Sequence, residues 1–101
     1  MPTVEYELNG LWFVWDDNKE LLVVSDHQIL FTEACSVFFD DNELTYDDTR
    51  FDYSEQRFIT IGFSNQARLL TIGWTLRDDK IRLITAIKAE SKHERLYQRR
   101  R

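Results

Sequence analysis

Apolar and polar residues alternate along the first part of the chain with the two-residue period of a β-strand. Residues 3–8 read TVEYEL and residues 11–15 read LWFVW, with Asn9-Gly10 between them. Asn-Gly between two such runs is a strong signal for a tight type I′ turn. We therefore predict a β-hairpin over residues 3–15. Its pairing would place one set of side chains on the core-facing side: Val4, Tyr6, Leu8, Leu11, Phe13 and Trp15.

The pattern becomes helical after the hairpin. Asp16 and Asp17 suit a helix N-terminus, because carboxylates accept hydrogen bonds from its free N–H groups and complement its dipole. The run DNKELLVV that follows favours a helix at its start, although two adjacent valines weaken it. A second helix is predicted over residues 31–39, where apolar residues recur at helical spacing. Residues 40–56 are acidic and loop-like, with one short strand predicted at residues 44–46.

Three strand-like apolar runs follow, at residues 57–63, 68–77 and 80–89. The connections between them are four and two residues long, so neighbouring strands should be antiparallel. Residues 90–101 form a polar tail that we expect to be helical. The expected fold is α+β: an N-terminal β-hairpin, two short helices, a three-stranded antiparallel meander and a C-terminal helix, in one domain spanning residues 1–101.

Length and composition fit a single soluble domain. The chain has 101 residues and is 43% hydrophobic and 14% aromatic, which argues against a disordered chain. Cys35 is the only cysteine, so an internal disulfide is impossible, and we expect it to be a buried apolar residue. There is no long apolar run and no basic-then-apolar leader. We therefore expect a cytoplasmic protein with no membrane contact.

Charge divides the chain into two unlike parts. Residues 1–56 hold 2 Lys or Arg against 14 Asp or Glu, whereas residues 57–101 hold 11 against 4. A basic sheet-and-tail half in an acidic chain indicates a surface that holds an anion or an acidic partner. Because the two signs lie in separate blocks, a homo-oligomer in which these blocks meet is a further expectation.

The basic residues of the meander are the first candidates for chemistry. Strict alternation would put Arg82 and Lys88 on one face of the last strand, roughly 20 Å apart, where they could follow successive phosphates. Arg57 and Arg77 lie at strand ends. An arginine fork binds phosphate and stabilises the charge that develops as a phosphodiester is cleaved. The alternative is that exposed strand positions carry charge for solubility and edge protection, and the pattern alone favours this alternative.

Histidine is the side chain that ordinarily exchanges protons near neutrality, and the chain has two, His27 and His93. His27 lies at the junction of the two predicted helices, where a side chain can project from a scaffold, although capping or packing is the commoner role. The sequence has no glycine-rich phosphate loop, no HExxH and no nucleophile elbow. This disfavours P-loop nucleotide hydrolases, zinc proteases and α/β-hydrolases. No metal site or other cofactor is expected.

The order of residues from Phe13 to about Tyr97 resembles the BrnT toxin family of bacterial type II toxin–antitoxin systems. Phe13-Val-Trp15-Asp16 with Asn18-Lys19 is similar to the family's opening F-x-W-D-x-x-K, and His27 falls where its lysine–histidine pair ends. The remaining motifs follow in the family's order: Phe31-Thr-Glu33-Ala34, Val37-Phe38, Arg57-Phe58 with Gly62, Arg68-Leu-Leu, Arg77, Arg82-Leu-Ile-Thr-Ala86 with Lys88-Ala89, and Glu94-Arg95 with Tyr97.

This resemblance implies a RelE-like ribonuclease fold and a toxin that cleaves RNA without a metal, neutralised by a separately encoded antitoxin protein. Carried over by position, four residues would be catalytic: His27 as general base or acid, with Arg57, Arg82 and Lys88 around the phosphate. Further RNA contacts would come from Arg77, Lys80, Arg95 and Tyr97. RNA and the antitoxin are thus the partners that the resemblance implies.

The chain departs from the family pattern beside these residues. Asp26 stands where the family has the lysine before the histidine, and Ile87 where it has an arginine. Loss of one transition-state cation typically lowers a rate by about 10²–10³. The alternative function is therefore a catalytically degenerate BrnT-like protein that binds another protein or itself. Convergence of the four catalytic candidates on one cleft would favour the enzyme, whereas their scatter over both faces of the sheet would remove its geometric basis.

Overall fold

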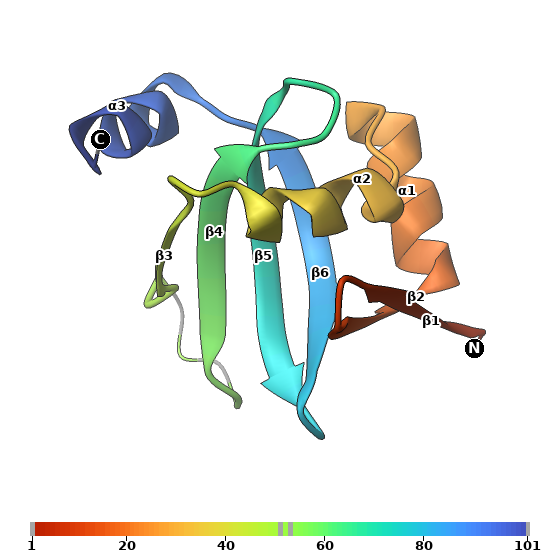
Figure 1. The fold of residues 1–101 in the computed structure, drawn as a ribbon. Coiled ribbons are helices and arrows are strands. Elements are labelled where there is room, and N and C mark those ends of the chain that lie inside the picture. Colours follow the sequence, from red (N-terminus) through yellow and green to blue (C-terminus); the bar gives the residue numbers. More distant parts are fainter. Residues whose placement is uncertain (1, 51, 53, 101) are drawn as a thin grey trace.

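A six-stranded sheet forms the centre of the protein, with helices beside it and across one face (Figure 1). The computed structural model describes residues 2–50, 52 and 54–100. Within these residues the strands are β1 (Thr3–Leu8), β2 (Leu11–Asp16), β3 (Leu44–Asp47), β4 (Arg57–Phe63), β5 (Leu69–Arg77) and β6 (Lys80–Lys88). The helices are α1 (Asp17–His27), α2 (Phe31–Ser36), the short 3₁₀ helix η1 (Val37–Phe39) and α3 (Ser91–Arg100).

The strand order is β1-β2-β6-β5-β4-β3. Neighbouring strands are antiparallel except β2 and β6, which run parallel over the pairs Phe13–Ile81 and Val14–Arg82. The α+β prediction is confirmed, and the sheet is larger than the pattern indicated. β3 extends the meander to four strands, and the hairpin joins the same sheet.

The hairpin forms as predicted. β1 and β2 pair in the expected register, which matches Leu8 with Leu11. Asn9 and Gly10 both have positive φ, 50° and 90°, the conformation that a type I′ turn requires. Phe13, on the expected inner side, is fully buried.

The predicted helices differ from the observed ones only near their ends. Asp16 caps α1, and its carboxylate accepts a hydrogen bond from the Asn18 N–H at 2.8 Å, as expected of an acidic N-terminus. The helix predicted over residues 31–39 is split, because only Phe31–Ser36 is α-helical and the next turn is 3₁₀. The polar tail forms α3, and Arg101 at the end of the predicted range lies outside the described residues.

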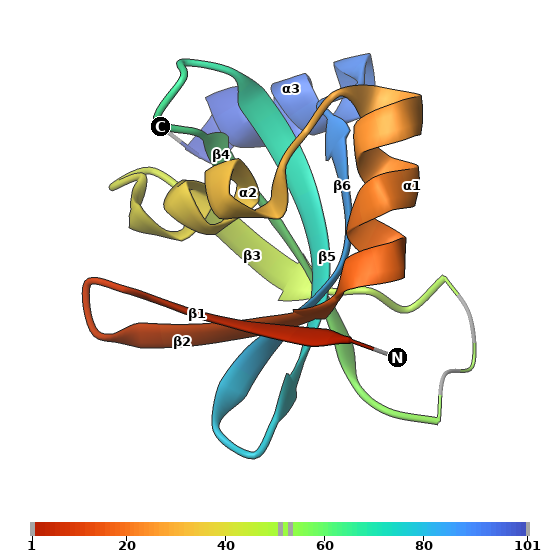
Figure 2. The same ribbon diagram turned by 90° about the vertical axis from the view of Figure 1, so that its right-hand side faces the viewer.

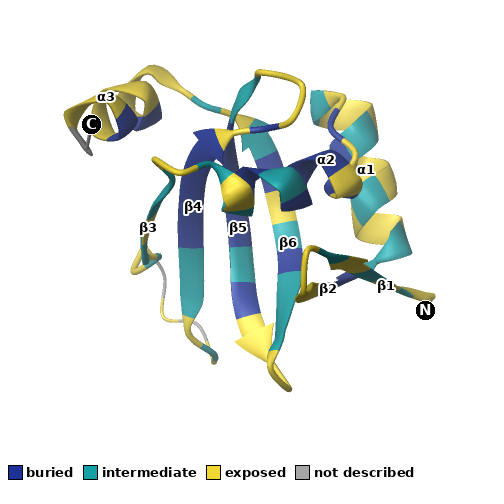
Figure 3. Ribbon diagram, in the orientation of Figure 1, coloured by how far each residue is buried: buried dark blue, intermediate teal, exposed yellow. Residues whose placement is uncertain are grey.

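The sheet has two unlike faces. On the helix-covered face, side chains of β5 and β6 pack with the hairpin, α1 and α2 into the main core, whose largest fully buried members are Trp15, Phe13 and Phe31. Figure 3 shows buried residues along β4 and β5 behind α2, and Figure 2 shows that α2 lies on one side of the strands. We call the side of the sheet opposite α2 the open face. α3 covers only its corner over β4, where Tyr97 packs with Ile59 and Ile61.

The single cysteine belongs to this core. Cys35 is fully buried, so the prediction of a buried apolar residue is confirmed. Burial disfavours the charged thiolate and raises the pKa of the Cys35 thiol. The side chain therefore acts in packing rather than as a nucleophile.

An irregularity in β6 changes one sequence-based expectation. The register of β5 and β6 shifts at Gly73–Trp74, which leaves Ile84 as an extra residue in β6. Such a bulge moves the residues after it to the other face of the sheet. Lys88 therefore lies on the helix-covered face and Arg82 on the open face. The expectation that these two share a face is wrong, because it assumed unbroken alternation along the strand.

No single helix in the described part of the chain is long and apolar enough to cross a membrane. α1 and the α2–η1 segment reach that length and composition only as a pair bent by 90°.

Candidate functional site

Two arginines stand in one line across the open face. Arg57 of β4 and Arg82 of β6 both pair with Thr75 of the intervening β5. Adjacent strands lie about 4.8 Å apart, which puts the two arginine backbones roughly 10 Å from each other. Long guanidinium side chains on one face can close that separation around a single anion. We call Arg57 and Arg82 the arginine row.

Carboxylates lie among the cations at this end of the sheet. Arg57 Nε is 3.7 Å from Glu55 Oε2, and Arg77 at the end of β5 donates to the other oxygen of Glu55 at 2.9 Å. Lys80, which pairs with Arg77, donates to Glu5 at 2.9 Å. The side chains of Arg77 and Lys80 are 53% and 36% exposed, so water competes with these ion pairs. Both cations therefore remain available to another anion.

His27 reaches the open face from a different element. It ends α1, which stands beside β6, and with Thr85 it lines a hollow of about 180 Å³. A second hollow, of about 270 Å³, joins His27 to Lys88. The four predicted catalytic residues thus form two groups, Arg57 with Arg82 and His27 with Lys88. These four described residues do not line a single cleft, because Arg57 and Arg82 lie on the open face whereas Lys88 lies on the helix-covered face. The geometric support for an enzyme therefore rests on Arg57 and Arg82.

A buried ion pair holds the end of α1. Glu33 of α2 is 4% exposed and accepts hydrogen bonds from the Arg68 guanidinium and the Ser64 hydroxyl. These bonds hold the pKa of Glu33 below its usual range, with that from Arg68 the stronger. Arg68 also donates to the carbonyl of Gln28, the residue after His27, at 3.0 Å. The pair therefore fixes the point from which His27 projects.

Tyr97 fastens α3 to the sheet. Its side chain packs edge-on against Phe63, and its hydroxyl donates to Asp40 at 2.6 Å. Tyr97 is 3% exposed, and a ring buried in this way offers little surface to an RNA base. Arg95 of the same helix is exposed. The structure thus separates these two predicted RNA contacts, one in the protein interior and one in solvent.

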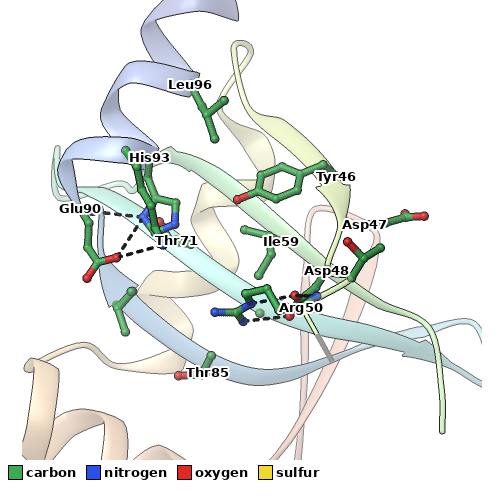
Figure 4. A pocket seen from close by; sticks show the side chains of 14 residues that line it. Tyr46, Asp47, Asp48, Arg50, Ile59, Thr71, Thr85, Glu90, His93 and Leu96 are labelled. Atoms are coloured by element: carbon green, nitrogen blue, oxygen red, sulfur yellow. Dashed lines mark hydrogen bonds and ion pairs between the residues drawn. The ribbon is translucent and has the colours of Figure 1, made fainter. Parts of the chain in front are cut away.

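A larger pocket, of about 490 Å³, lies between α3, the end of β3 and the open face (Figure 4). The side chain of Arg50 stands at its mouth, where both its Nε and Nη2 donate to the Asp48 carboxylate, at 2.8 and 2.9 Å. The floor and walls come from five elements, β3, β4, β5, β6 and α3: Tyr46, Ile59, Thr71, Gly73, Thr85, Ile87, His93 and Leu96. We call this cavity the α3 pocket.

His93 is held tightly at the α3 pocket. It is 8% exposed, and its Nδ1 accepts a hydrogen bond from the Glu90 N–H at 3.2 Å, just before α3 begins. Burial, and secondly the charge of Lys92, lower the pKa of His93 below its usual 6.5. Only the neutral ring leaves Nδ1 free to accept that hydrogen bond. The folded protein therefore favours the neutral ring.

Acidification is expected to loosen α3. Because the pKa of His93 is lower in the folded than in the unfolded protein, its contribution to stability is complete above about pH 6.5 and decreases as the pH falls below that value. Amide hydrogen exchange in α3, corrected for intrinsic rates, should be faster at about pH 5.5 than at about pH 7.5. The His93→Gln variant should lose most of this difference. Equal protection of the parent protein at both pH values would contradict the assignment.

Sequence reasoning missed the α3 pocket and its polar groups. Arg50 lies in the acidic segment interpreted as a solvated loop, yet it lines both the α3 pocket and a small hollow beside Arg57. A lone arginine within an acidic run was the available signal for it. Thr71 gave no signal, because an uncharged residue in a strand pattern looks like ordinary sheet. Across the described residues, no group of three or more His, Cys, Asp or Glu side chains is arranged to hold a metal ion.

Comparison with known proteins shows the family to which the chain is similar in sequence and fold. A family model, described as the ribonuclease toxin BrnT of type II toxin–antitoxin systems, matches residues 15–93. The fold is similar to the crystal structure of the Brucella abortus ribonuclease toxin BrnT, with a TM-score of 0.58 and 14% identity, covering 76% of this chain and 94% of that one. A search of curated proteins found no match.

The family match includes the elements that build the site. It contains α1 with His27, the buried Glu33–Arg68 pair and the strands that carry the arginine row, whereas β1 and most of β2 precede it. The likeness to the Brucella structure establishes a shared fold, and the family model establishes membership. The chain belongs to the BrnT family of ribonuclease toxins of type II toxin–antitoxin systems.

Proposed function

We propose that this protein cleaves RNA on its open face, with the arginine row holding the phosphodiester that is cut. One observation carries the proposal. Arg57 and Arg82 pair with the same residue, Thr75, from opposite sides, so their guanidinium groups can approach one phosphate together. Arg77 and Lys80, which pair with each other two residues further along β5, would hold the neighbouring phosphate of the RNA strand.

The reaction that suits these groups uses the RNA's own 2′-hydroxyl. This hydroxyl attacks the adjacent phosphorus while its proton passes to a base, and the P–O5′ bond breaks as O5′ takes up a proton. The products are a 2′,3′-cyclic phosphate and a 5′-hydroxyl end. Two guanidinium groups stabilise the negative charge that builds on the phosphoryl oxygens. No further reactant is needed.

His27 is the proposed proton carrier, because an imidazole can act as base and as acid near neutrality. It borders the open face at Thr85, and Lys88 lies beside it. The Lys88 ammonium would offset the charge of Asp26, which replaces the family's lysine. Arg95 on α3 is exposed and would contact a more distant part of the RNA. A separately encoded antitoxin is the protein partner that family membership supports.

The test is cleavage of an RNA oligonucleotide by the purified protein in EDTA, with analysis of the new ends. The parent protein should yield 2′,3′-cyclic phosphate and 5′-hydroxyl ends. A matched oligonucleotide with 2′-O-methyl groups should stay intact, because it lacks the attacking hydroxyl. Intact RNA after incubation with a folded sample would remove the ribonuclease proposal. Cleavage of the methylated oligonucleotide would show that the 2′-hydroxyl is not the nucleophile and would contradict the proposed reaction.

A second candidate function is a catalytically degenerate module that binds proteins or itself. The observation that favours it is the pairing of cations with carboxylates, since Glu55 contacts both Arg57 and Arg77 and Glu5 contacts Lys80. Such a protein would use its acidic and basic blocks for contacts between copies. Sedimentation at low and high salt tests this candidate, because self-association through these blocks should weaken as salt screens them. A monomer at every salt concentration would contradict it.

A further inference from the structure

We propose that the α3 pocket binds a nucleobase of the RNA and thereby selects the nucleotide next to the cleaved phosphate. The proposal rests on the ribonuclease function proposed above and assigns that site its substrate preference. The pocket, at about 490 Å³, lies within the size range of small-molecule sites. Like those sites, it combines apolar walls with a few convergent polar groups.

The pocket offers surfaces on which a flat ring can lie. Tyr46 projects from β3 toward the space in front of Ile59, and Leu96 faces the same space from α3 (Figure 4). Every nucleobase has a π-face that stacks on an aromatic side chain, and apolar side chains cover the other side of the base. A base can therefore enter between the helix and the sheet.

Thr71 gives the pocket a hydrogen-bonding group that no described residue pairs with. The residue is 5% exposed and lies in the pocket floor, and its Oγ1 has no hydrogen-bond partner within the described residues. Buried hydroxyls are normally paired, because an unpaired one costs stability. A hydroxyl can both donate and accept, so the edge of a base supplies the missing bond.

The rim of the pocket distinguishes between ligands. Glu90 lines it together with the cations Arg50 and Lys92, and a carboxylate at this place accepts hydrogen bonds from the amino group of a base. Adenine, guanine and cytosine carry an exocyclic amino group, whereas uracil carries none. The pocket should therefore prefer the amino-bearing bases.

The pocket also opens toward the arginine row. A small hollow beside Arg57 shares Arg50, Gly73 and Thr85 with it. Along β5, Thr71 and Thr75 are four residues apart, roughly 13 Å at ~3.3 Å per residue. An arginine side chain and one nucleotide, placed end to end, are together long enough to bridge the distance between Thr71 and Thr75. A base in the pocket would thus belong to the nucleotide adjoining the phosphate at the row.

Binding of single nucleotides tests the pocket without requiring cleavage. Titration of the ¹⁵N-labelled protein with AMP, GMP, CMP or UMP should shift the amide signals of Thr71, Ile87 and Leu96. UMP should bind most weakly, and ribose 5-phosphate, which has no base, should leave these signals unmoved. Equal shifts with ribose 5-phosphate, or shifts confined to another surface, would overturn the proposal.

Two variants with matched controls sharpen the test. Leu96→Trp should fill the pocket and weaken nucleotide binding at least about tenfold, whereas Leu21→Trp, on the exposed side of α1, should not. Thr71→Val removes the hydroxyl at nearly constant volume and should weaken binding by about three- to tenfold, the effect of one lost hydrogen bond. Thr32→Val, at an exposed position, should have no effect. Full binding by both pocket variants would overturn the proposal.

Mapping which bases lie beside the cut tests the base-binding pocket independently of whether the protein is a ribonuclease. If the parent protein cleaves RNA, the Leu96→Trp variant should still cleave it but with a weaker preference for particular bases next to the cleaved phosphate. Active protein with no nucleotide binding and an unchanged preference would overturn the pocket and leave the ribonuclease standing. Nucleotide binding at Thr71 without any cutting would overturn the ribonuclease and support the pocket as a base-binding site.

Discussion

Replacing Arg57 and Arg82 together with alanine is expected to lower the rate of RNA cleavage by at least about 10³-fold. One preorganised contact to developing charge is worth about 10²–10³ in rate. Arg57 and Arg82 pair with Thr75 from opposite sides, and in the proposed site they would hold the same phosphate, so the effects of the two substitutions need not multiply. The rate should be measured under single-turnover conditions, where chemistry is separated from product release. Arg57 and Arg82 are partly exposed, and the melting temperature should change by only a few degrees.

Two further variants show whether the loss comes from the row itself. Arg57→Lys/Arg82→Lys keeps both charges but replaces the planar fork with a point charge, and should recover only part of the rate. Arg99→Ala removes an exposed cation at the far end of α3 and should leave cleavage within about threefold of the parent. Cleavage that survives the double alanine change in a folded protein would remove the arginine row from the active site.

The Arg68→Ala variant is expected to lose about 3 kcal/mol of folding free energy, which corresponds to a fall of roughly 15 °C in melting temperature for a domain of this size. The change leaves the buried Glu33 carboxylate with the Ser64 hydroxyl as its remaining side-chain partner, and it frees the Gln28 carbonyl at the end of α1. The Arg68 side chain is 29% exposed, so we place the loss at the low end of values for buried pairs. Urea unfolding followed by circular dichroism gives the free energy directly.

The charge-free pair Glu33→Gln/Arg68→Met is the matched control. This double variant removes the Glu33 charge that Arg68→Ala leaves buried without its ion-pair partner, so it should be more stable than Arg68→Ala. The parent should also lose stability as the pH falls below about 4.5, since the pKa of Glu33 is lower in the folded protein than in the unfolded chain. A similar melting temperature for Arg68→Ala and the parent would contradict the structural role of this pair.

Local patterns in the sequence account for most of the fold. Asn9-Gly10 fixes the hairpin register, and the two-residue connection at residues 78–79 makes β5 and β6 neighbours. The parallel contact of Phe13 with Ile81 was not predictable in this way, because it joins segments far apart in the chain. The extra residue Ile84 was hidden for another reason. The run IRLITAIK is rich in β-branched residues without a glycine or proline, and it looks like one regular strand.

The candidate site was predictable only in part. The pairing of Arg82 with Thr75 follows from the two-residue connection at residues 78–79. The connection predicted at residues 64–67 would pair Arg57 with Trp74, whereas β5 begins at Leu69 and Arg57 pairs with Thr75, so the common row could not be derived from the sequence. The α3 pocket could not be derived either, because it depends on how α3 docks. In that docking, the Tyr97 hydroxyl donates a hydrogen bond to Asp40, which lies 57 residues earlier in the sequence. A single long-range hydrogen bond leaves no periodic pattern in the sequence. Burial of Tyr97 also shows why an aromatic residue in a basic tail is a weak indicator of RNA contact.

The parallel pairing of β2 with β6 has a consequence for the order of folding. β4, β5 and β6 are joined by short links, so the row that carries Arg57 and Arg82 can form from one contiguous stretch of chain. The hairpin also forms from neighbouring residues, but its place beside β6 requires closure of a loop that includes most of the protein. The entropic cost of closure rises with loop length, and such distant contacts slow folding. The hairpin is synthesised before β6, yet it can take its place in the sheet only after β6 has formed.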